Sequence, residues 1–332
     1  MKPRILVTES ITGTPVDELA QRFDVRHEPD AWQSPERLAG LVADCDALLV
    51  RNQTPVTAKL LKAASKLRVI GRAGVGLDNI DVKAASAGGI VVVSTPEQNS
   101  LSVAELAVGM MFALARNIAS SDRHVRGGGW DRRRFTGVEL SGKTLGLVGL
   151  GRIGFLTGLR ARALGMEVIA HDEFVSPDSA AVSETRARLV GLDELLASAD
   201  FVSAHVPLSN ATRGMFGAAQ FERMKPTAYF LNLARGELVN ESDLHQALMN
   251  GRLAGAALDV REQEPPAASP LHQLDNVIFA PHIGAFTREG QSRVVASVCH
   301  DVANVLSGAT PRYFVNFPRP PESPLAGLQY IE

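Results

Sequence analysis

The sequence predicts an α/β protein made of two doubly wound parallel sheets, and three observations support this class. From Arg4 to Ser94, short apolar runs alternate with helix-like segments, the pattern of a parallel sheet covered by helices on both faces. From Lys143 to Asp172, a second region has the order strand, helix, strand around three glycines. Four more apolar runs follow between Asp200 and Ala280. A chain of 332 residues is also long for a single core and suits two domains.

The first region contains five apolar runs that predict strands, at residues 5–7, 23–25, 47–50, 67–70 and 90–93. Helix-like spacing separates them, near residues 15–22, 34–43, 56–64 and 81–88. The region has no dinucleotide fingerprint of its own. Its candidate site is the glycine-dense loop from Gly71 to Asp78, whose backbone N–H groups could bind an anion, although turn geometry would explain the glycines equally well.

The segment from Asn99 to Arg116 predicts a helix that is apolar on nearly every side. A helix of this kind is buried, either between domains or against another subunit. We therefore expect a homodimer that forms through this helix.

The second region carries the pattern of a dinucleotide-binding turn. A short buried strand, residues 144–148, leads into Gly149, Gly151 and Gly154 in the spacing G-x-G-x-x-G, and helix spacing follows. The first glycine permits the tight turn, the second lets the backbone approach a pyrophosphate, and the third lets the helix pack close to the strand. Asp172, 18 residues beyond Gly154, ends the next strand, where a carboxylate accepts ribose hydroxyls. No Arg follows it to hold a 2′-phosphate, so we expect NAD rather than NADP.

Four later apolar runs predict strands, at residues 200–204, 229–233, 254–258 and 277–280. Ligands of open parallel sheets bind beyond the carboxyl ends of the strands, so the residues after these runs converge on the cofactor edge. Arg235, Glu264 and His282 have complementary uses there. A His exchanges the hydroxyl proton near neutral pH, a carboxylate orients its ring, and an Arg offers a planar fork to a substrate carboxylate. Together they indicate hydride transfer involving a 2-hydroxy or 2-oxo acid, although each residue alone would be explained by a structural role.

Composition and charge restrict the kinds of partner and the cellular location that we expect. The net charge is −2 and the charged residues are spread along the chain, which favours small molecules over nucleic acid or a membrane as partners. The apolar run at residues 5–7 is too short for a signal peptide, and no run reaches about 18 apolar residues. Cys45 and Cys299 form no metal-binding or redox spacing. We expect a soluble, cytoplasmic protein without a metal.

Several motifs, taken in order, give the chain a specific likeness. They are GRAGVGLDNID, TPEQNSLSVAELAVGMMFALAR, ELSGKTLGLVGLGRIG, HVPLSNATRG, LNLARGELV, ALDVREQEPP and PHIGA. Through them the sequence resembles the D-isomer-specific 2-hydroxyacid dehydrogenase family over nearly its whole length. The resemblance implies a Rossmann nucleotide domain, residues 99–285, inserted into a flavodoxin-like substrate domain made of residues 1–98 and 286–332.

The resemblance also implies roles for the three ionisable residues. Arg235 would hold the substrate carboxylate, His282 would be the acid/base, and Glu264 would pair with His282.

For the cofactor, the resemblance implies contacts from several loops of the nucleotide domain. Besides the three glycines and Asp172, these contacts are at Arg152, Ile153, Val206, Pro207, Thr212, Leu233, Ala234, Asp259 and Gly284. Asp259 would hold the nicotinamide carboxamide. On the substrate side, Val75 and Gly76 would reach in from the first domain together with Arg51.

Within the family, the likeness is greatest to the 3-phosphoglycerate dehydrogenase branch, through LLVRNQTPVTAKLLKAASKLRVIGRAGVGLDNID and WDRRRF. There, Arg51 would face a distal phosphate, while Phe286 replaces the small residue usual after PHIGA. We expect an NAD-dependent enzyme that interconverts a D-2-hydroxy acid and its 2-keto acid, with 3-phosphoglycerate as the first candidate. Two alternatives stay open. One is a reductase of a small non-phosphorylated 2-keto acid of the glyoxylate or hydroxypyruvate type, and the other is a non-catalytic NADH-sensing protein like the corepressors that resemble this family.

Overall fold

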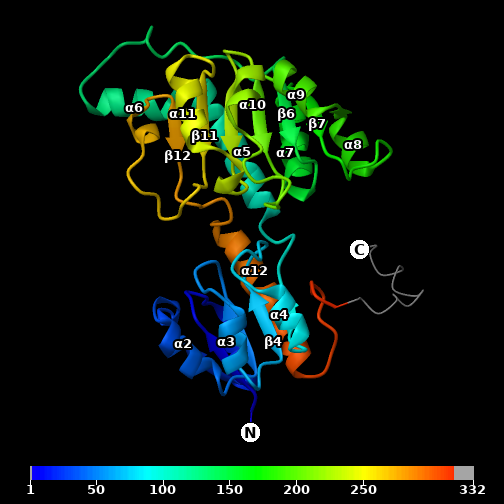
Figure 1. The fold of residues 1–332 in the computed structure, drawn as a ribbon. Helices are drawn as coiled ribbons and strands as arrows, with labels where there is room; N and C mark the ends of the chain where they lie inside the picture. The colour runs from blue at the N-terminus through cyan, green and yellow to red at the C-terminus, as the bar shows by residue number, and fades with distance from the viewer. Residues whose placement is uncertain (1, 318–332) are drawn as a thin grey trace. The chain divides into compact units, whose positions relative to one another are not determined.

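The computed structural model describes residues 2–317, which form two compact units. One unit consists of the chain up to Asn99 and the segment from Gln291 onward, and the other is Ser100–Gly290. These divisions fall one and five residues beyond the expected boundaries after residues 98 and 285. Residue 1 and residues 318–332, the last part of the expected third segment, lie outside the described residues. Each unit holds a parallel sheet covered by helices (Figure 1), so the predicted α/β class is confirmed.

The first unit is built on five parallel strands in the order β2-β1-β3-β4-β5, the flavodoxin-like order. The strands are β1 (Arg4–Val7), β2 (Asp24–His27), β3 (Ala47–Val50), β4 (Val69–Arg72) and β5 (Val91–Val93). The helices are α1 (Thr14–Arg22), α2 (Pro35–Val42), α3 (Ala58–Ala63), α4 (Val82–Ala87) and most of α12 (Arg288–Leu306), with a short 3-10 helix η1 (Ala31–Gln33). The strand order reverses between β1 and β3, which is where doubly wound sheets bind their ligands.

Both faces of this sheet are covered, because alternate side chains of the four strands β1, β3, β4 and β5 enter different cores. Ile5 and Val7 of β1 share one cluster with Val298 and Val302 of α12, while Leu6 belongs to a second cluster with residues of α2, α3 and α4. Figure 1 shows α12, in orange, beside the blue and cyan elements of this unit. The last described helix therefore completes the core that the N-terminal strands begin.

The second unit is built on seven parallel strands in the order β12-β11-β10-β9-β6-β7-β8. The strands are β6 (Thr144–Val148), β7 (Glu167–His171), β8 (Arg188–Leu189), β9 (Phe201–Ala204), β10 (Tyr229–Asn232), β11 (Gly255–Leu258) and β12 (Val277–Phe279). The helices are α5 (Ser100–Ala115), α6 (Ile118–Arg126), α7 (Arg152–Ala163), α8 (Ala180–Thr185), α9 (Leu192–Ser198), α10 (Ala218–Arg223) and α11 (Glu241–Met249), with the 3-10 helices η2 (Gly236–Leu238) and η3 (Pro270–Gln273). Read from β8, this is the dinucleotide-binding order with one strand added, and it reverses between β6 and β9.

Helix α5 packs inside its own unit. Met111 and Leu114 share a core with Leu145 of β6, on the face that α7 also covers, while α9, α10 and α11 cover the opposite face. The buried side of α5 is therefore covered by the sheet of its own unit, without another subunit. Only its exposed side chains, such as Leu101 and Phe112, bear on the expected homodimer.

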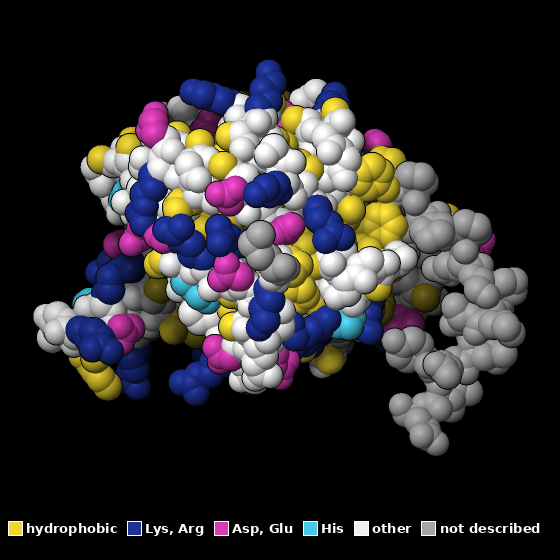
Figure 2. Space-filling view, turned by 90° about the horizontal axis from the view of Figure 1, so that it is seen from below, with side chains coloured by type: hydrophobic (Ala, Val, Ile, Leu, Met, Phe, Trp, Pro, Cys, Tyr) yellow, Lys and Arg dark blue, Asp and Glu magenta, His cyan; other side chains and the backbone are white. Residues whose placement is uncertain are grey.

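The helices, the surface charges and the two cysteines bear on the expectations from composition. Among residues 2–317, no single helix is long and apolar enough to cross a membrane; α5 and α6 pass only when taken together, and they are bent by 60° at the break between them. On the face in Figure 2, Lys and Arg side chains lie interspersed with Asp and Glu. Cys45 and Cys299 are free and buried, and burial raises the pKa of these thiols to about 11 and about 12.

Candidate active site

The turn after β6 has the geometry that the glycine pattern predicts. Gly149 has a φ of 99°, a left-handed conformation that favours glycine. A Cβ on Gly154 would lie 2.2 Å from the carbonyl oxygen of Gly149, so the first turn of α7 packs on the loop only without a side chain. A Cβ on Gly151 would meet nothing within 4 Å. Arg152 and Ile153 begin α7 beside this open space, and no described side chain caps the helix, so its first N–H groups face outward for an anion.

Asp172 follows β7, and its carboxylate is held in place by the backbone. Its Oδ2 accepts a hydrogen bond from Leu150 N at 2.8 Å, and its Oδ1 accepts one from Phe174 N at 2.9 Å. The acid is thereby tied to the glycine turn, and each oxygen keeps a second acceptor position. These residues fit a dinucleotide, because an uncapped helix start suits a pyrophosphate and the fixed carboxylate suits a ribose.

The other residues expected to contact the cofactor follow neighbouring strands. Val206 and Pro207 lie after β9, in a loop that Thr212 closes by donating a hydrogen bond from its Oγ1 to the Pro207 carbonyl at 2.7 Å. Leu233 and Ala234 follow β10. Because β6, β9 and β10 are adjacent and parallel, these loops line the same edge of the sheet as the glycine turn.

His282 and Glu264 form a close pair at this edge. His282 Nδ1 lies 2.6 Å from Glu264 Oε2, and the two side chains are 36% and 33% exposed. His282 has a φ of 57°, which is unusual for a residue other than glycine, and its N–H donates to the Asp259 carbonyl at 2.7 Å. Backbone strain of this kind is concentrated at functional sites, so the outlier itself supports a role for His282.

Asp259 follows β11 and fixes the loop that carries the histidine. It is 1% exposed, and its Oδ1 and Oδ2 accept hydrogen bonds from Ile283 N and Gly284 N, both at 2.8 Å. Burial raises the pKa of this carboxyl, and the two backbone hydrogen bonds oppose the rise. Each oxygen keeps a second acceptor position, so the expected bond to a nicotinamide carboxamide is compatible with this geometry.

Arg235 follows β10 and acts on the carboxylate of Glu264. Its carbonyl accepts a hydrogen bond from Asn232 Nδ2 at 2.8 Å, and its Nη1 donates to the Ala234 carbonyl at 2.7 Å. Burial would raise the pKa of Glu264, but the hydrogen bond and charge of His282, a backbone N–H and the charge of Arg235 together lower it below its usual value. The structure thus brings the three ionisable residues together, with Glu264 ionised at neutral pH.

Arg51, Val75 and Gly76 belong to the first unit and lie beyond the carboxyl ends of β3 and β4. The Arg51 loop is fixed by Glu9, which follows β1 and is 3% exposed. Glu9 accepts hydrogen bonds from Arg51 N at 2.7 Å and from Thr54 N and Oγ1 at 3.0 and 2.7 Å. Glu9 is not predictable from the sequence, because a single acid after a strand forms no pattern.

A second missed group surrounds Glu264. Arg261 is only 7% exposed, and its side chain contacts Glu241 and His272. In the sequence, the only sign of this group is the arginine within the motif ALDVREQEPP. An arginine that becomes buried needs charged or polar partners, but nothing in the spacing identifies Glu241, the first residue of α11, as that partner.

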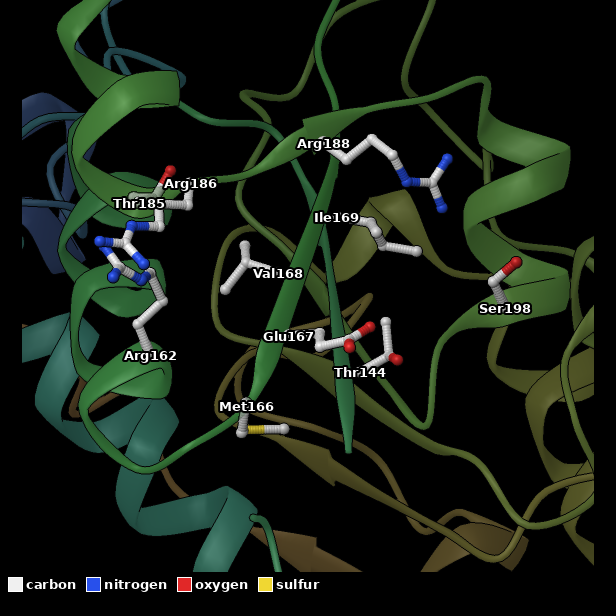
Figure 3. A pocket seen from close by; sticks show the side chains of 10 residues that line it. All are labelled: Thr144, Arg162, Met166, Glu167, Val168, Ile169, Thr185, Arg186, Arg188 and Ser198. Atoms are coloured by element: carbon white, nitrogen blue, oxygen red, sulfur yellow. The ribbon is translucent and has the colours of Figure 1, made fainter. Parts of the chain in front are cut away.

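A cavity of about 490 Å³ lies at the opposite edge of the seven-stranded sheet (Figure 3). Thr144 and Glu167, which begin β6 and β7, line it, and so does Arg162, which donates a hydrogen bond to the Glu184 carbonyl. No residue expected to bind cofactor or substrate lines this cavity. The candidate active site is therefore the carboxyl edge of the sheet and not this hollow.

The sheet order, the glycine turn and the fixed carboxylate after β7 define a dinucleotide-binding α/β protein. Residues 108–284 match the family described as D-isomer specific 2-hydroxyacid dehydrogenase, NAD binding domain. The chain belongs to this family, as the motifs predicted, and its cofactor is NAD.

Individual relatives agree with the family match. The chain is 44% identical to the D-3-phosphoglycerate dehydrogenase of Archaeoglobus fulgidus, over 95% of this chain and 59% of the relative. It is also 44% identical to the D-3-phosphoglycerate dehydrogenase of Methanocaldococcus jannaschii, over 98% of this chain and 62% of the relative. The chain thus spans about 60% of the length of these two enzymes. A crystal structure of a protein from Thermus thermophilus is 34% identical, with a TM-score of 0.88 and coverage of 94% of this chain and 99% of the other.

Proposed function

We propose that the protein is an NAD-dependent dehydrogenase that interconverts a D-2-hydroxy acid and its 2-keto acid. The observation that carries this proposal is the His282–Glu264 pair, 2.6 Å apart, at the sheet edge that also holds Arg235 and the glycine turn. We assign NAD binding to the second unit and most of the substrate binding to the first. Family membership and the names of the relatives support this assignment.

The three residues divide the chemistry between them. When bound, the cofactor supplies or accepts the hydride. Arg235 binds the substrate carboxylate through its planar guanidinium and polarises the adjacent carbonyl. In the reduction, His282 donates its Nε2 proton to the carbonyl oxygen, which becomes the hydroxyl, and the imidazole is left neutral. Glu264, ionised at neutral pH, accepts the Nδ1 proton in a hydrogen bond and favours the imidazolium that gives up the proton.

For the substrate, we propose 3-phosphoglycerate or another 2-hydroxy acid with a second anionic group. Arg51 supports this class, because it lies where the first sheet reverses its strand order and a guanidinium suits a phosphate. Phe286 favours a second candidate class, the small non-phosphorylated 2-keto acids of the glyoxylate or hydroxypyruvate type. It is 59% exposed, follows His282 by four residues, and offers no hydrogen bond to a phosphate.

The test is NADH oxidation with a panel of 3-phosphohydroxypyruvate, hydroxypyruvate, glyoxylate and pyruvate. We expect the highest kcat/KM with 3-phosphohydroxypyruvate. A preference for glyoxylate or hydroxypyruvate would support the second class. NADH binding without turnover of any 2-keto acid would overturn both and leave a nucleotide-sensing protein.

We predict that His282→Ala lowers kcat by about 100-fold or more while the NADH dissociation constant stays nearly unchanged. General acid/base catalysis contributes about 10²–10⁴ to a rate, and His282 is not expected to bind the cofactor. Steady-state kinetics and NADH fluorescence titration measure the two quantities. Turnover equal to wild type would remove His282 from the mechanism.

We also propose a cytoplasmic homodimer. Apolar side chains are exposed along one segment of α5, α6 and the following loop, at Leu101, Phe112, Ile118, Val125, Trp130 and Val138. Exposed apolar surface of this kind is typical of an interface. The two free thiols support a reducing compartment. Light scattering should give twice the chain mass, and a monomer at micromolar concentration would contradict the dimer.

A further inference from the structure

Next to the proposed active site lies an ion pair that the mechanism above does not use. Arg261 donates from Nε to Glu241 Oε1 at 2.9 Å and from Nη2 to Glu241 Oε2 at 2.7 Å. The arginine side chain is 6% exposed and the glutamate side chain 17% exposed. This is the bidentate geometry in which a guanidinium holds a carboxylate most firmly.

Two more contacts fix the guanidinium. Its Nη1 lies 2.8 Å from His272 Nε2, and because arginine is only a donor, that ring nitrogen must accept. The guanidinium carbon also lies 5.0 Å from the centre of the Phe279 ring. Arg261 is therefore held by α11, η3 and β12 at once, although its own backbone lies in a loop.

The fixed arginine is linked directly to the Glu264–His282 pair. Arg261 N donates to Glu264 Oε1 at 3.1 Å, so the two carboxylate oxygens of Glu264 contact Arg261 and His282 respectively. The neighbouring Glu262 N donates to Glu241 Oε1 at 2.9 Å. The loop that carries Glu264 is thus attached to α11 through both a side chain and the backbone.

The same loop also adjoins the substrate-binding arginine. A Cβ on Gly236, the residue after Arg235, would lie 1.9 Å from the carbonyl carbon and oxygen of Arg261. The two backbones are therefore in direct contact at this point, and a displacement of Arg261 would reach Arg235 as well as Glu264.

We propose that Arg261, clamped by Glu241 and His272, is a positioning residue that sets Glu264 against His282 for proton transfer. This inference rests on the proposed function. Glu264 is a third exposed and lies in a loop without helix or strand, and a surface pair of that kind has no fixed geometry unless its support is rigid. The clamp supplies that support from regular elements of the second unit.

The first experiment measures Arg261→Met, with Arg261→Lys as the conservative variant and Arg223→Met as a matched control. Arg223 pairs with Asp193 at 3.0 Å on the surface of the same unit. We expect Arg261→Met to lower kcat by roughly 10-fold to 100-fold with an unchanged NADH dissociation constant, because small misplacements of catalytic groups have effects of this size. Arg261→Lys should recover part of the loss, and Arg223→Met should show none.

A double-mutant cycle separates positioning from general damage. In a Glu264→Gln background, Arg261→Met should change kcat by less than about twofold, because the residue through which Arg261 acts is already altered. A full additional loss in that background would overturn the proposal. If Arg261→Met fails to fold, the double variant Arg261→Met with Glu241→Met, which removes both charges of the ion pair, takes its place in the same cycle.

A measurement without substrate distinguishes this proposal from the proposed function. The NMR chemical shift of His282 Nδ1, which reports the hydrogen bond to Glu264, should change in Arg261→Met and in Glu264→Gln alike, because each variant alters that contact. Such a change in a protein without turnover would support the positioning role and overturn only the enzymatic proposal. An unchanged Nδ1 chemical shift in Arg261→Met, alongside a change in Glu264→Gln, would overturn the positioning role.

Discussion

Single residues define the chemistry at the cofactor edge, and Asp172 illustrates this best. Its carboxylate is tied to Leu150 N and Phe174 N, so its position is set before any ligand arrives. A negative group held there accepts ribose hydroxyls and repels a 2′-phosphate. We therefore propose that the preference for NAD over NADP depends on the Asp172 side chain more than on the surrounding loop.

We predict that Asp172→Ala lowers the ratio of kcat/KM for NADH over NADPH by about 10-fold or more, which corresponds to about 1.4 kcal/mol. The reason is the loss of both the ribose acceptor and the repulsion. Glu173→Ala, a change of the adjacent exposed acid, serves as the control and should leave the ratio alone. An unaltered ratio in Asp172→Ala would show that another group reads the ribose.

A second single residue, His205 after β9, affects the pH dependence of the stability. Its Nε2 lies 2.9 Å from Ser203 Oγ, and burial lowers its pKa from 6.5 to about 4. The imidazole is therefore neutral in the folded protein at physiological pH, and its stability contribution depends on pH. Between pH 6.5 and 4 the unfolded chain binds a proton here that the folded chain does not.

It follows that the contribution of His205 is fully present above about pH 6.5 and is lost as the pH falls through about 4. We predict that wild type loses up to about 3 kcal/mol of unfolding free energy from this residue, and that His205→Gln loses less across that range. Urea denaturation at a series of pH values measures it. His27→Gln, at an exposed position, is the control. Parallel pH curves for wild type and His205→Gln would contradict the assignment.

At the scale of elements, Gly151 and Gly154 at the start of α7 have opposite surroundings. The Cβ position of Gly154 is occupied by the Gly149 carbonyl, whereas that of Gly151 opens into empty space. Gly154 is therefore required by the fold, and we propose that Gly151 is required by the pyrophosphate that would bind beside it.

We predict that Gly154→Ala lowers the free energy of unfolding by about 1–3 kcal/mol, because a Cβ 2.2 Å from a backbone oxygen forces α7 to shift. Gly151→Ala should leave the melting temperature unchanged and weaken NADH binding. Thermal unfolding and NADH fluorescence titration separate the two effects. Gly109→Ala in α5, where nothing lies within 4 Å, is the control. Wild-type NADH affinity in Gly151→Ala would contradict the placement of the pyrophosphate.

At the scale of the whole molecule, each unit holds its own cores. In the second unit, one cluster lies under α5 and α7 and another under α9, α10 and α11, so both faces of the sheet are covered by its own helices. The chain enters this unit after Asn99 and leaves it after Gly290.

We therefore predict that a protein of residues 100–290 folds, melts cooperatively and binds NADH, but does not turn over any 2-keto acid. Circular dichroism during heating, NADH titration and the NADH oxidation assay provide the three readouts. A fragment that aggregates or melts without a cooperative transition would contradict the independence of this unit. Turnover by the fragment would contradict the role proposed for Arg51.

Most of the strands were predictable because they are buried on both faces and appear as continuous apolar runs. The predicted run at residues 229–233, for example, corresponds to β10 at Tyr229–Asn232. β2 is mostly exposed, and the run predicted at residues 23–25 overlaps it only in part. β8 was not predicted, because this strand of two residues contains the exposed Arg188 and forms no apolar run. The short helices α8 to α11, whose few buried positions form no long periodic pattern, were not predicted either.

The proximity of Arg235, Glu264 and His282 could be predicted because each follows a strand or a recognisable motif, and parallel strands bring their carboxyl ends to one edge. The contacts that hold these residues in place could not be predicted. Arg261 and Glu241 are 20 residues apart, and their contact depends on how a loop meets the first turn of α11. Glu9, which follows β1, contacts the Arg51 loop after the neighbouring strand β3 in the same way. Such contacts depend on tertiary packing and leave no periodic trace.

The participation of α12 in the first unit has a consequence for biosynthesis. A Cβ on Gly71 of β4 would lie 2.7 Å from Val302 and 2.9 Å from Val298, so this helix lies directly on the sheet. During translation, α1 alone can cover that face of the sheet until the ribosome has released the residues that follow Gly290. The second unit emerges complete before then, so it is the part of the nascent chain that can fold first, whereas the core of the first unit is completed last.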